Sequence, residues 1–250
     1  MTSILVLLTA AAVSSPNPDL ARADSLFRAG EVREALELAV EVAGRGEDRY
    51  EALTAAGAYA VALGTVTEPD DPRAAGAHFA RAEELAAEAV SLRPRAEAIE
   101  ARYWELAAIG RRAQAAGILE AGRLANRIHE GARALLRDAP DHPGAHHLLG
   151  ALYLEVLTLP RLSRLAARTV LRGDLLADAS WENAERHLRD AAAGDPEALL
   201  HQVDLARLLL ERGEDTEARR HLQAVLDAPV RVPPDCVFQD QARALLAAIG

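Results

Sequence analysis

The chain has 250 residues, half of them hydrophobic but only 4% aromatic, and its alanine- and leucine-rich apolar set favours helices over strands. Its net charge is −10 and its basic residues other than histidine are all arginine, a balance that disfavours nucleic-acid binding, which needs clustered cations. The single cysteine, Cys236, excludes an intramolecular disulfide and a cysteine-based zinc site.

The first predicted element is an apolar run of ten residues, Ile4 to Val13. A bilayer-spanning helix needs about 20 residues, but a run this short fits the core of an export signal. Small residues follow the run, so we expect residues 1–15 to be a signal peptide and the protein to be exported to the periplasm. The alternatives are a terminal helix docked on the rest of the protein and a cytoplasmic location. No other segment is long and apolar enough to be a transmembrane helix.

The rest of the chain shows apolar residues at helical spacing, interrupted by proline and glycine. The segment at 65–72 has turn-forming residues and is expected to be a loop. We expect helices at 18–29, 31–44, 48–64, 73–91, 95–109, 113–137, 143–157, 161–172, 180–193, 197–212, 214–228 and 236–249.

The late helices repeat with a fixed period. Three pairs of residues are each 34 positions apart: Ala184 and Ala218, His187 and His221, and Leu188 and Leu222. A helix–turn–helix repeat of 34 residues is typical of tetratricopeptide repeats. The opening-helix pattern of that repeat occurs twice, at Leu149, Gly150 and Tyr153 and at Leu205, Ala206 and Leu209.

Each helix pair is amphipathic, so neighbouring pairs must stack to bury a shared core. Glycines at Gly30 and Gly213 are expected to make the tight turns between paired helices. The sequence therefore predicts an all-α, tetratricopeptide-repeat-like right-handed α-solenoid of antiparallel helix pairs. We expect it to occupy residues 16–250 as one domain, with helix 236–249 as a C-terminal cap.

One helix pair is interrupted by an insert. The paired alanine expected near position 162 occurs at Ala184, so about 22 residues are inserted, at about 158–179. Four arginines in the insert fall at helical spacing: Arg161, Arg164, Arg168 and Arg172. They are candidates for contact with an acidic partner or an anionic membrane surface. The favoured alternative is that they are solvated or paired with the protein's own acidic residues.

The stretch from His146 to Ala191 contains LLGALYLEV, then LTLPRLSRLAARTVL, then ASWENAERHLRDA. In this stretch, and on to Ile249, the chain resembles the regulator-of-microtubule-dynamics family. The resemblance implies a tetratricopeptide-like protein-interaction module with an interrupted helix pair and no catalytic residues.

Two further places are candidates for partner contacts. Tyr103 and Trp104 lie on a helix whose inner face would line a concave groove, the alternative being that they pack in the core. His142, His146 and His147 crowd one turn, and the first two have the i, i+4 spacing of a metal-binding pair. A polar or groove-facing role is favoured for these histidines, so His146 is listed with the partner-binding candidates and no metal or other cofactor is expected.

No phosphate-binding loop, nucleophile elbow or metalloprotease motif occurs in the sequence. We therefore expect a non-catalytic scaffold or adaptor that binds a protein or peptide on the concave face of the solenoid. The alternative is a periplasmic small-molecule-binding helper protein of a transporter, which a deep apolar cavity near Trp104 would favour. The sequence leaves the identity of the partner and the oligomeric state open.

Overall fold

The computed structural model describes residues 17–46, 48–160 and 170–249 of the protein. Within these ranges the chain forms twelve helices and no strand, which confirms the all-α prediction. The chain divides into two compact units, residues 1–115 with 231–234 and residues 116–230 with 235–250. The predicted signal peptide at 1–15 lies outside the described residues, as do Arg161, Arg164 and Arg168. None of the helices in the described ranges is both long enough and apolar enough to cross a bilayer.

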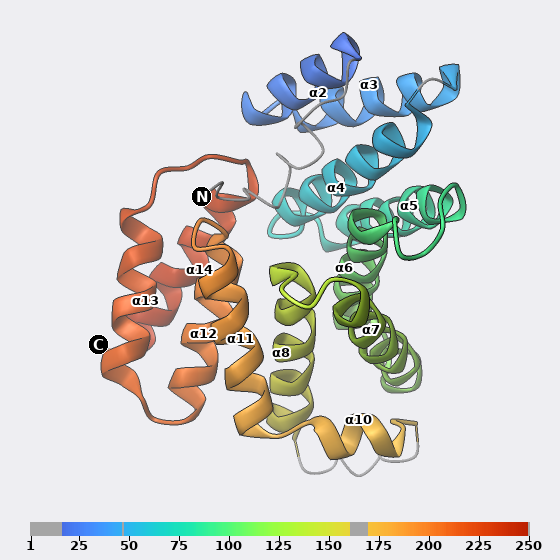
Figure 1. The fold of residues 1–250 in the computed structure, drawn as a ribbon. Helices are drawn as coiled ribbons and strands as arrows, with labels where there is room; N and C mark the ends of the chain where they lie inside the picture. Colours follow the sequence, from blue (N-terminus) through green and yellow to red (C-terminus); the bar gives the residue numbers. More distant parts are fainter. Residues whose placement is uncertain (1–16, 47, 161–169, 250) are drawn as a thin grey trace. The chain divides into compact units, whose positions relative to one another are not determined.

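In its described residues, the first unit contains five helices, each packed on the next (Figure 1). They are α2 (Pro18–Arg28), α3 (Val32–Arg45), α4 (Arg49–Thr67), α5 (Pro72–Ser91) and α6 (Ile99–Ala115). Helix α4 is buried without interruption from Ala52 to Ala60, whereas α5 buries only one face. Helix α4 can therefore be apolar on nearly all sides, while α5 keeps an amphipathic sequence.

The second unit contains the interrupted helix pair. Its helices are α7 (Ile118–Asp138), α8 (Pro143–Thr158), α10 (Gly173–Asp178), α11 (Trp181–Gly194), α12 (Leu199–Glu211), α13 (Asp215–Asp227) and α14 (Pro234–Ala248). Helix α8 packs along α11, and α12 packs along α13 (Figure 1). The buried amide of Gln239 on α14 donates to the backbone carbonyls of Val225 and Ala228 at the end of α13, so the last helix caps this unit as predicted.

Glycine allows the paired helices to approach closely. A Cβ atom on Gly150 of α8 would lie 2.6 Å from Leu188 Cγ and 2.9 Å from the Leu188 backbone nitrogen of α11. In the first unit, a Cβ on Gly57 of α4 would lie 3.3 Å from Ala86 Cβ of α5. Both contacts fall at the same position of the repeat, which confirms the repeat pattern deduced from the sequence.

The turns between paired helices also follow the prediction. Gly30 and Gly213 have φ angles of 94° and 77°, a left-handed conformation that glycine adopts at little cost. Each therefore ends one helix and lets the next begin within two or three residues.

Several predicted boundaries are wrong. Helix α4 continues to Thr67, so the loop expected at 65–72 is shorter, and it ends where the Asp71 side chain accepts a hydrogen bond from Ala74 N and caps α5. Helix α6 begins at Ile99 rather than at 95, because the residues after Pro94 form a turn in which Glu97 N donates to the Pro94 carbonyl.

The insert also differs from the expectation where it is described. Residues 170–172 are not helical, although a helix was expected to end there. Instead the six-residue helix α10 follows. A helix this short is less than two turns long, so its sequence carries too little periodicity to reveal it.

Candidate functional site

Seven of the eight histidines in the sequence belong to the second unit. Four of them lie on α8, α11 and α12 together with two carboxylates. They form two separate clusters: His146, His187 and Asp190, and His147, His201 and Asp204. Because α8 packs on both α11 and α12, neighbouring histidines on α8 can face two different helices.

His142 is not part of either cluster. Its Nδ1 accepts a hydrogen bond from the Ala145 backbone N–H at 3.0 Å, so the side chain caps the start of α8. The i, i+4 pair of His142 and His146, an arrangement that the sequence analysis did not favour as a metal site, is therefore not assembled. His146 turns instead toward α11.

The first cluster joins His146 of α8 to His187 and Asp190 of α11. The two Nδ1 atoms of His146 and His187 are 2.9 Å apart, and His146 Nδ1 is 3.5 Å from Asp190 Oδ2. His146 Nε2 lies 2.9 Å from the carbonyl oxygen of Pro140. Burial, with the nearby charge of Arg186, lowers the pKa of His187 to about 4, so this imidazole is neutral at neutral pH.

The second cluster is buried between α8 and α12. His147 Nε2 lies 2.8 Å from Asp204 Oδ2, and the His147 ring stacks on His201 with centroids 4.8 Å apart. Arg207 donates from Nη1 to the other oxygen of Asp204 at 2.9 Å. Burial alone would raise the pKa of Asp204, but the hydrogen bonds and charges of His147 and Arg207 lower it to about 2.

Arg207 extends this cluster to the surface. Its Nη2 donates to Glu155 of α8 at 3.0 Å, and the two side chains are 41% and 49% exposed. A buried carboxylate thus holds an exposed guanidinium in place. Sequence analysis did not single out Asp204 or Arg207, although their i, i+3 spacing on one helix is a usable signal.

The tryptophan site predicted for partner contact is buried. Tyr103 and Trp104 of α6 are 4% and 6% exposed, and their rings lie 4.8 Å apart. This burial favours the packing alternative, and a partner-binding role for the two residues stays a prediction.

The described end of the insert is held by α7. Asn126 donates from Nδ2 to the Val170 carbonyl at 2.9 Å and accepts at Oδ1 from Arg172 N at 3.0 Å. Arg172 forms an ion pair with Glu130. This arginine is the one of the four insert arginines that the described ranges include, and it is paired with the protein's own acid.

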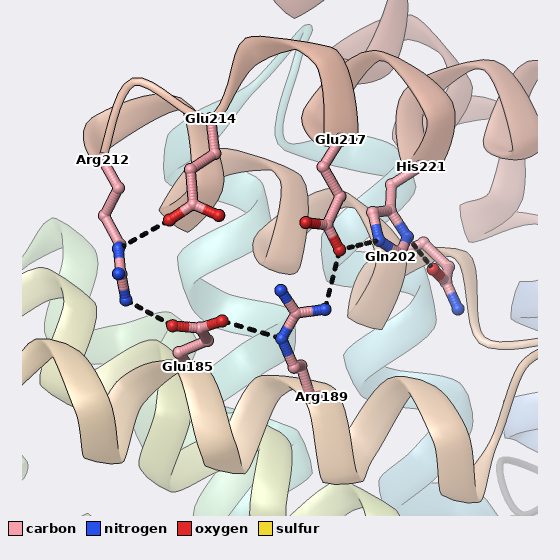
Figure 2. A network of polar contacts seen from close by, with 7 residues as sticks. All are labelled: Glu185, Arg189, Gln202, Arg212, Glu214, Glu217 and His221. Carbon is pink, nitrogen blue, oxygen red and sulfur yellow. Dashed lines mark hydrogen bonds and ion pairs between the residues drawn. The ribbon is translucent and has the colours of Figure 1, made fainter.

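A polar network links α11 to the next helix pair (Figure 2). Arg189 donates to Glu185 on its own helix and to Glu217 of α13, each at 2.8 Å, while Arg212 contacts both Glu185 and Glu214. His221 Nδ1 lies 2.8 Å from Gln202 Oε1. Because the charged groups satisfy one another, we assign this network to holding successive helix pairs together rather than to binding.

Comparison with known proteins agrees with this architecture. The chain matches the family model described as "Regulator of microtubule dynamics protein 1-3" over residues 19–250. No curated protein matches the chain significantly.

Two solved structures were found to be similar to the chain. The chain is similar to TTC0263, a thermophilic TPR protein in Thermus thermophilus, with a TM-score of 0.63 and 19% sequence identity over 92% of this chain and 98% of that one. A monomeric mutant of IFIT1 with m7Gppp-AAAA gives a TM-score of 0.49 and 18% identity over 91% of this chain and 53% of that one.

The paired helices, their common register and the likeness to TTC0263 define the class: a tetratricopeptide-repeat-like helical protein. The family model covers nearly the whole chain. The chain therefore belongs to the regulator of microtubule dynamics protein 1-3 family, and the resemblance found in the sequence is confirmed.

Proposed function

We propose that this chain is a non-catalytic scaffold that binds a protein or peptide through the opening helices of its repeats, α8 and α12. Repeat proteins of this class offer extended surfaces in which helices position the contact residues. The class of the fold supports a role in protein interaction.

The observation that carries the proposal is the anchored guanidinium of Arg207. Buried Asp204 fixes it from one side, and exposed Glu155 approaches it from the other. A carboxylate of a partner can replace Glu155 at the same guanidinium, because arginine binds carboxylates with directional hydrogen bonds. Little side-chain ordering is needed on binding, since Asp204 already holds the arginine.

The same geometry supports the non-catalytic part of the proposal. His147 and Asp204 form a hydrogen-bonded pair of the kind used in acid–base chemistry, but each is only 7% exposed. A reacting substrate would need direct access to the imidazole. We therefore assign the pair to stabilising the contact between α8 and α12 and to anchoring Arg207.

Photocrosslinking in the native cells tests this proposal. A photoreactive phenylalanine analogue replaces Glu155, and a matched control replaces Asp240, an exposed acid on α14. We expect one dominant protein adduct from the Glu155 position, absent from the Asp240 position and reduced when Arg207→Gln is added. Equal adducts at both positions, or no protein adduct at Glu155, would overturn the proposal. Absence of a protein adduct at Glu155 would instead favour the alternative, a small-molecule-binding helper protein of a transporter.

A further inference from the structure

The cluster of His146, His187 and Asp190 can be compared with the residues at the equivalent positions of the next helix pair. Leu149 and Gly150 of α8 occupy the repeat positions of Leu205 and Ala206 of α12, so His146 corresponds to Gln202. His187 corresponds in the same way to His221, 34 residues later. The pair His146–His187 is thus the repeat equivalent of Gln202–His221, which Figure 2 shows.

The two equivalent pairs differ in chemistry. Gln202 Oε1 can only accept, so His221 Nδ1–H donates to it at 2.8 Å and the pair is a simple hydrogen bond. In the other pair, two imidazole nitrogens face each other at 2.9 Å. The third group differs as well, because Asp190 is replaced by Ala224 in the next repeat. At two of the three positions, therefore, this helix pair has a metal-ligand residue type and the next one does not.

The backbone fixes which nitrogen of His146 faces the cluster. The Pro140 carbonyl only accepts hydrogen bonds, so His146 Nε2 must carry the proton that it shares with this oxygen at 2.9 Å. In the neutral ring, Nδ1 then bears a lone pair directed at His187 and Asp190. A histidine whose far nitrogen donates to a backbone carbonyl is the usual arrangement of a metal ligand.

The distances suit a small divalent ion. The three ligand atoms all lie within 4.8 Å of one another. A tetrahedral Zn²⁺ ion with nitrogen and oxygen ligands at about 2.0–2.1 Å separates them by about 3.3 Å. The separations from His146 Nδ1 to His187 Nδ1 and to Asp190 are 2.9 and 3.5 Å, and the exposed Asp190 side chain can close the third. The Asp190 side chain is 47% exposed, so water can reach the fourth position.

We propose that His146 Nδ1, His187 Nδ1 and the Asp190 carboxylate form a binding site for a divalent transition-metal ion of the Zn²⁺ type. Imidazole and carboxylate ligands suit Zn²⁺, Co²⁺ and Ni²⁺. In the metal-free pair, neutral His187 carries its single proton on Nδ1 and shares it with His146 Nδ1. On binding, this proton moves through solvent to His187 Nε2, so that both Nδ1 lone pairs face the ion.

The neighbouring side chain of Arg186 disfavours binding of a cation. Arg186 Nη2 lies 3.4 Å from His187 Nε2, where its donor suits an unprotonated nitrogen and its charge repels a cation. Arg186 also donates to Asn183 at 3.0 Å, so it has another partner when Nε2 carries a proton. Replacing Arg186 with glutamine removes the charge and supplies an acceptor, so we expect Arg186→Gln to bind the ion more tightly.

The test uses the full chain, freed of metal with a chelator and titrated with Zn²⁺ by calorimetry and with Co²⁺ by visible absorption. We expect saturable binding of one ion per chain, with the d–d bands of tetrahedral Co²⁺. His146→Gln and Asp190→Asn should each weaken binding at least about tenfold, because each removes a ligand. His146→Gln should remain folded by circular dichroism, because it recreates the glutamine–histidine pair of the next repeat.

The control is His221→Gln, which alters the equivalent position in the next repeat and should leave the affinity unchanged. Binding that survives both His146→Gln and Asp190→Asn would place the ion elsewhere and overturn the proposal. Absence of saturable binding to the unaltered chain would overturn it too, and leave the two histidines as a hydrogen-bonded pair. Weaker binding in Arg186→Gln would contradict the assigned role of that arginine.

Discussion

Burial lowers the pKa of histidines in the second unit, among them His187 and His201. His201 is 2% exposed, and burial, with the charge of His147, places its pKa well below the ordinary range. The pKa of His187 is lowered to about 4. Asp204 differs because hydrogen bonds from His147 and Arg207 outweigh its burial and keep it ionised. The unit therefore contains neutral imidazoles together with an ionised buried carboxylate.

Because the pKa values of these histidines are lowered by folding, we expect the second unit to become less stable as the pH falls. In the unfolded chain they bind protons near pH 6.5, but in the folded chain they do so only at lower pH. Their stabilising effect is thus complete above about pH 6.5 and is lost as the pH falls toward their folded pKa values. Each group adds a slope of up to about 1.4 kcal/mol per pH unit to the unfolding free energy.

Urea unfolding between about pH 7.5 and 5 measures this slope. His201→Leu should reduce it, whereas His78→Leu, which alters the histidine of the first unit, should leave the slope of the second unit unchanged. An unfolding free energy that does not depend on pH in this window would contradict the prediction. Asp204 does not affect the window, because its own contribution is lost only below about pH 4.

At the scale of helices, α8 and α11 approach each other closely at Gly150. The backbone nitrogen of Leu188 would lie 2.9 Å from a Cβ at Gly150, and a backbone atom within a helix cannot move alone. We expect Gly150→Ala to lower the unfolding free energy by about 1–3 kcal/mol. The control is Gly76→Ala in α5, where no atom lies within 4 Å of the added Cβ.

Alanine favours helix formation more than glycine does, so Gly76→Ala should leave stability unchanged or raise it by up to about 1 kcal/mol. Chemical denaturation of both variants provides the comparison. Similar stability changes in the two would show that the α8–α11 contact does not restrict residue size.

The helices were predictable because their signals are local. Periodicity, turn glycines and the 34-residue spacing identified nearly every long helix, and Gly150 was found from the repeat pattern alone. Helix α10 was missed because six residues carry too little periodicity. The end of α4 was misplaced because Thr65 and Thr67 continue the helix, with hydroxyls that donate to carbonyls four residues back.

The candidate sites were less predictable, since their partners are distant in sequence. His146 was singled out, but its pairing with His187 crosses the insert, and its orientation depends on the Pro140 carbonyl. The repeat register contained a usable signal, because it aligns His146 with Gln202 and His187 with His221. Asn126, which holds the end of the insert, leaves no such pattern.

At the scale of the whole molecule, the division into two compact units leads us to expect that a mutation destabilises its own unit more than the other. In repeat proteins each helix pair is stabilised mainly by its neighbours, so a weakened pair should open without the distant ones. We expect Gly150→Ala to speed amide hydrogen exchange in α8, α11 and α12 and to leave α4 and α5 near their original rates. Exchange measured by mass spectrometry would contradict this if protection fell equally in both units.

The correspondence between Gln202–His221 and His146–His187 also bears on how such a site can arise. Glutamine and histidine codons differ at a single base, so one point mutation changes one kind of pair into the other. In both versions the histidine on the second helix finds a hydrogen-bond acceptor, so neither version leaves it unsatisfied. A repeat array can therefore gain or lose one histidine ligand of such a site by a single base change that keeps a hydrogen bond within the pair.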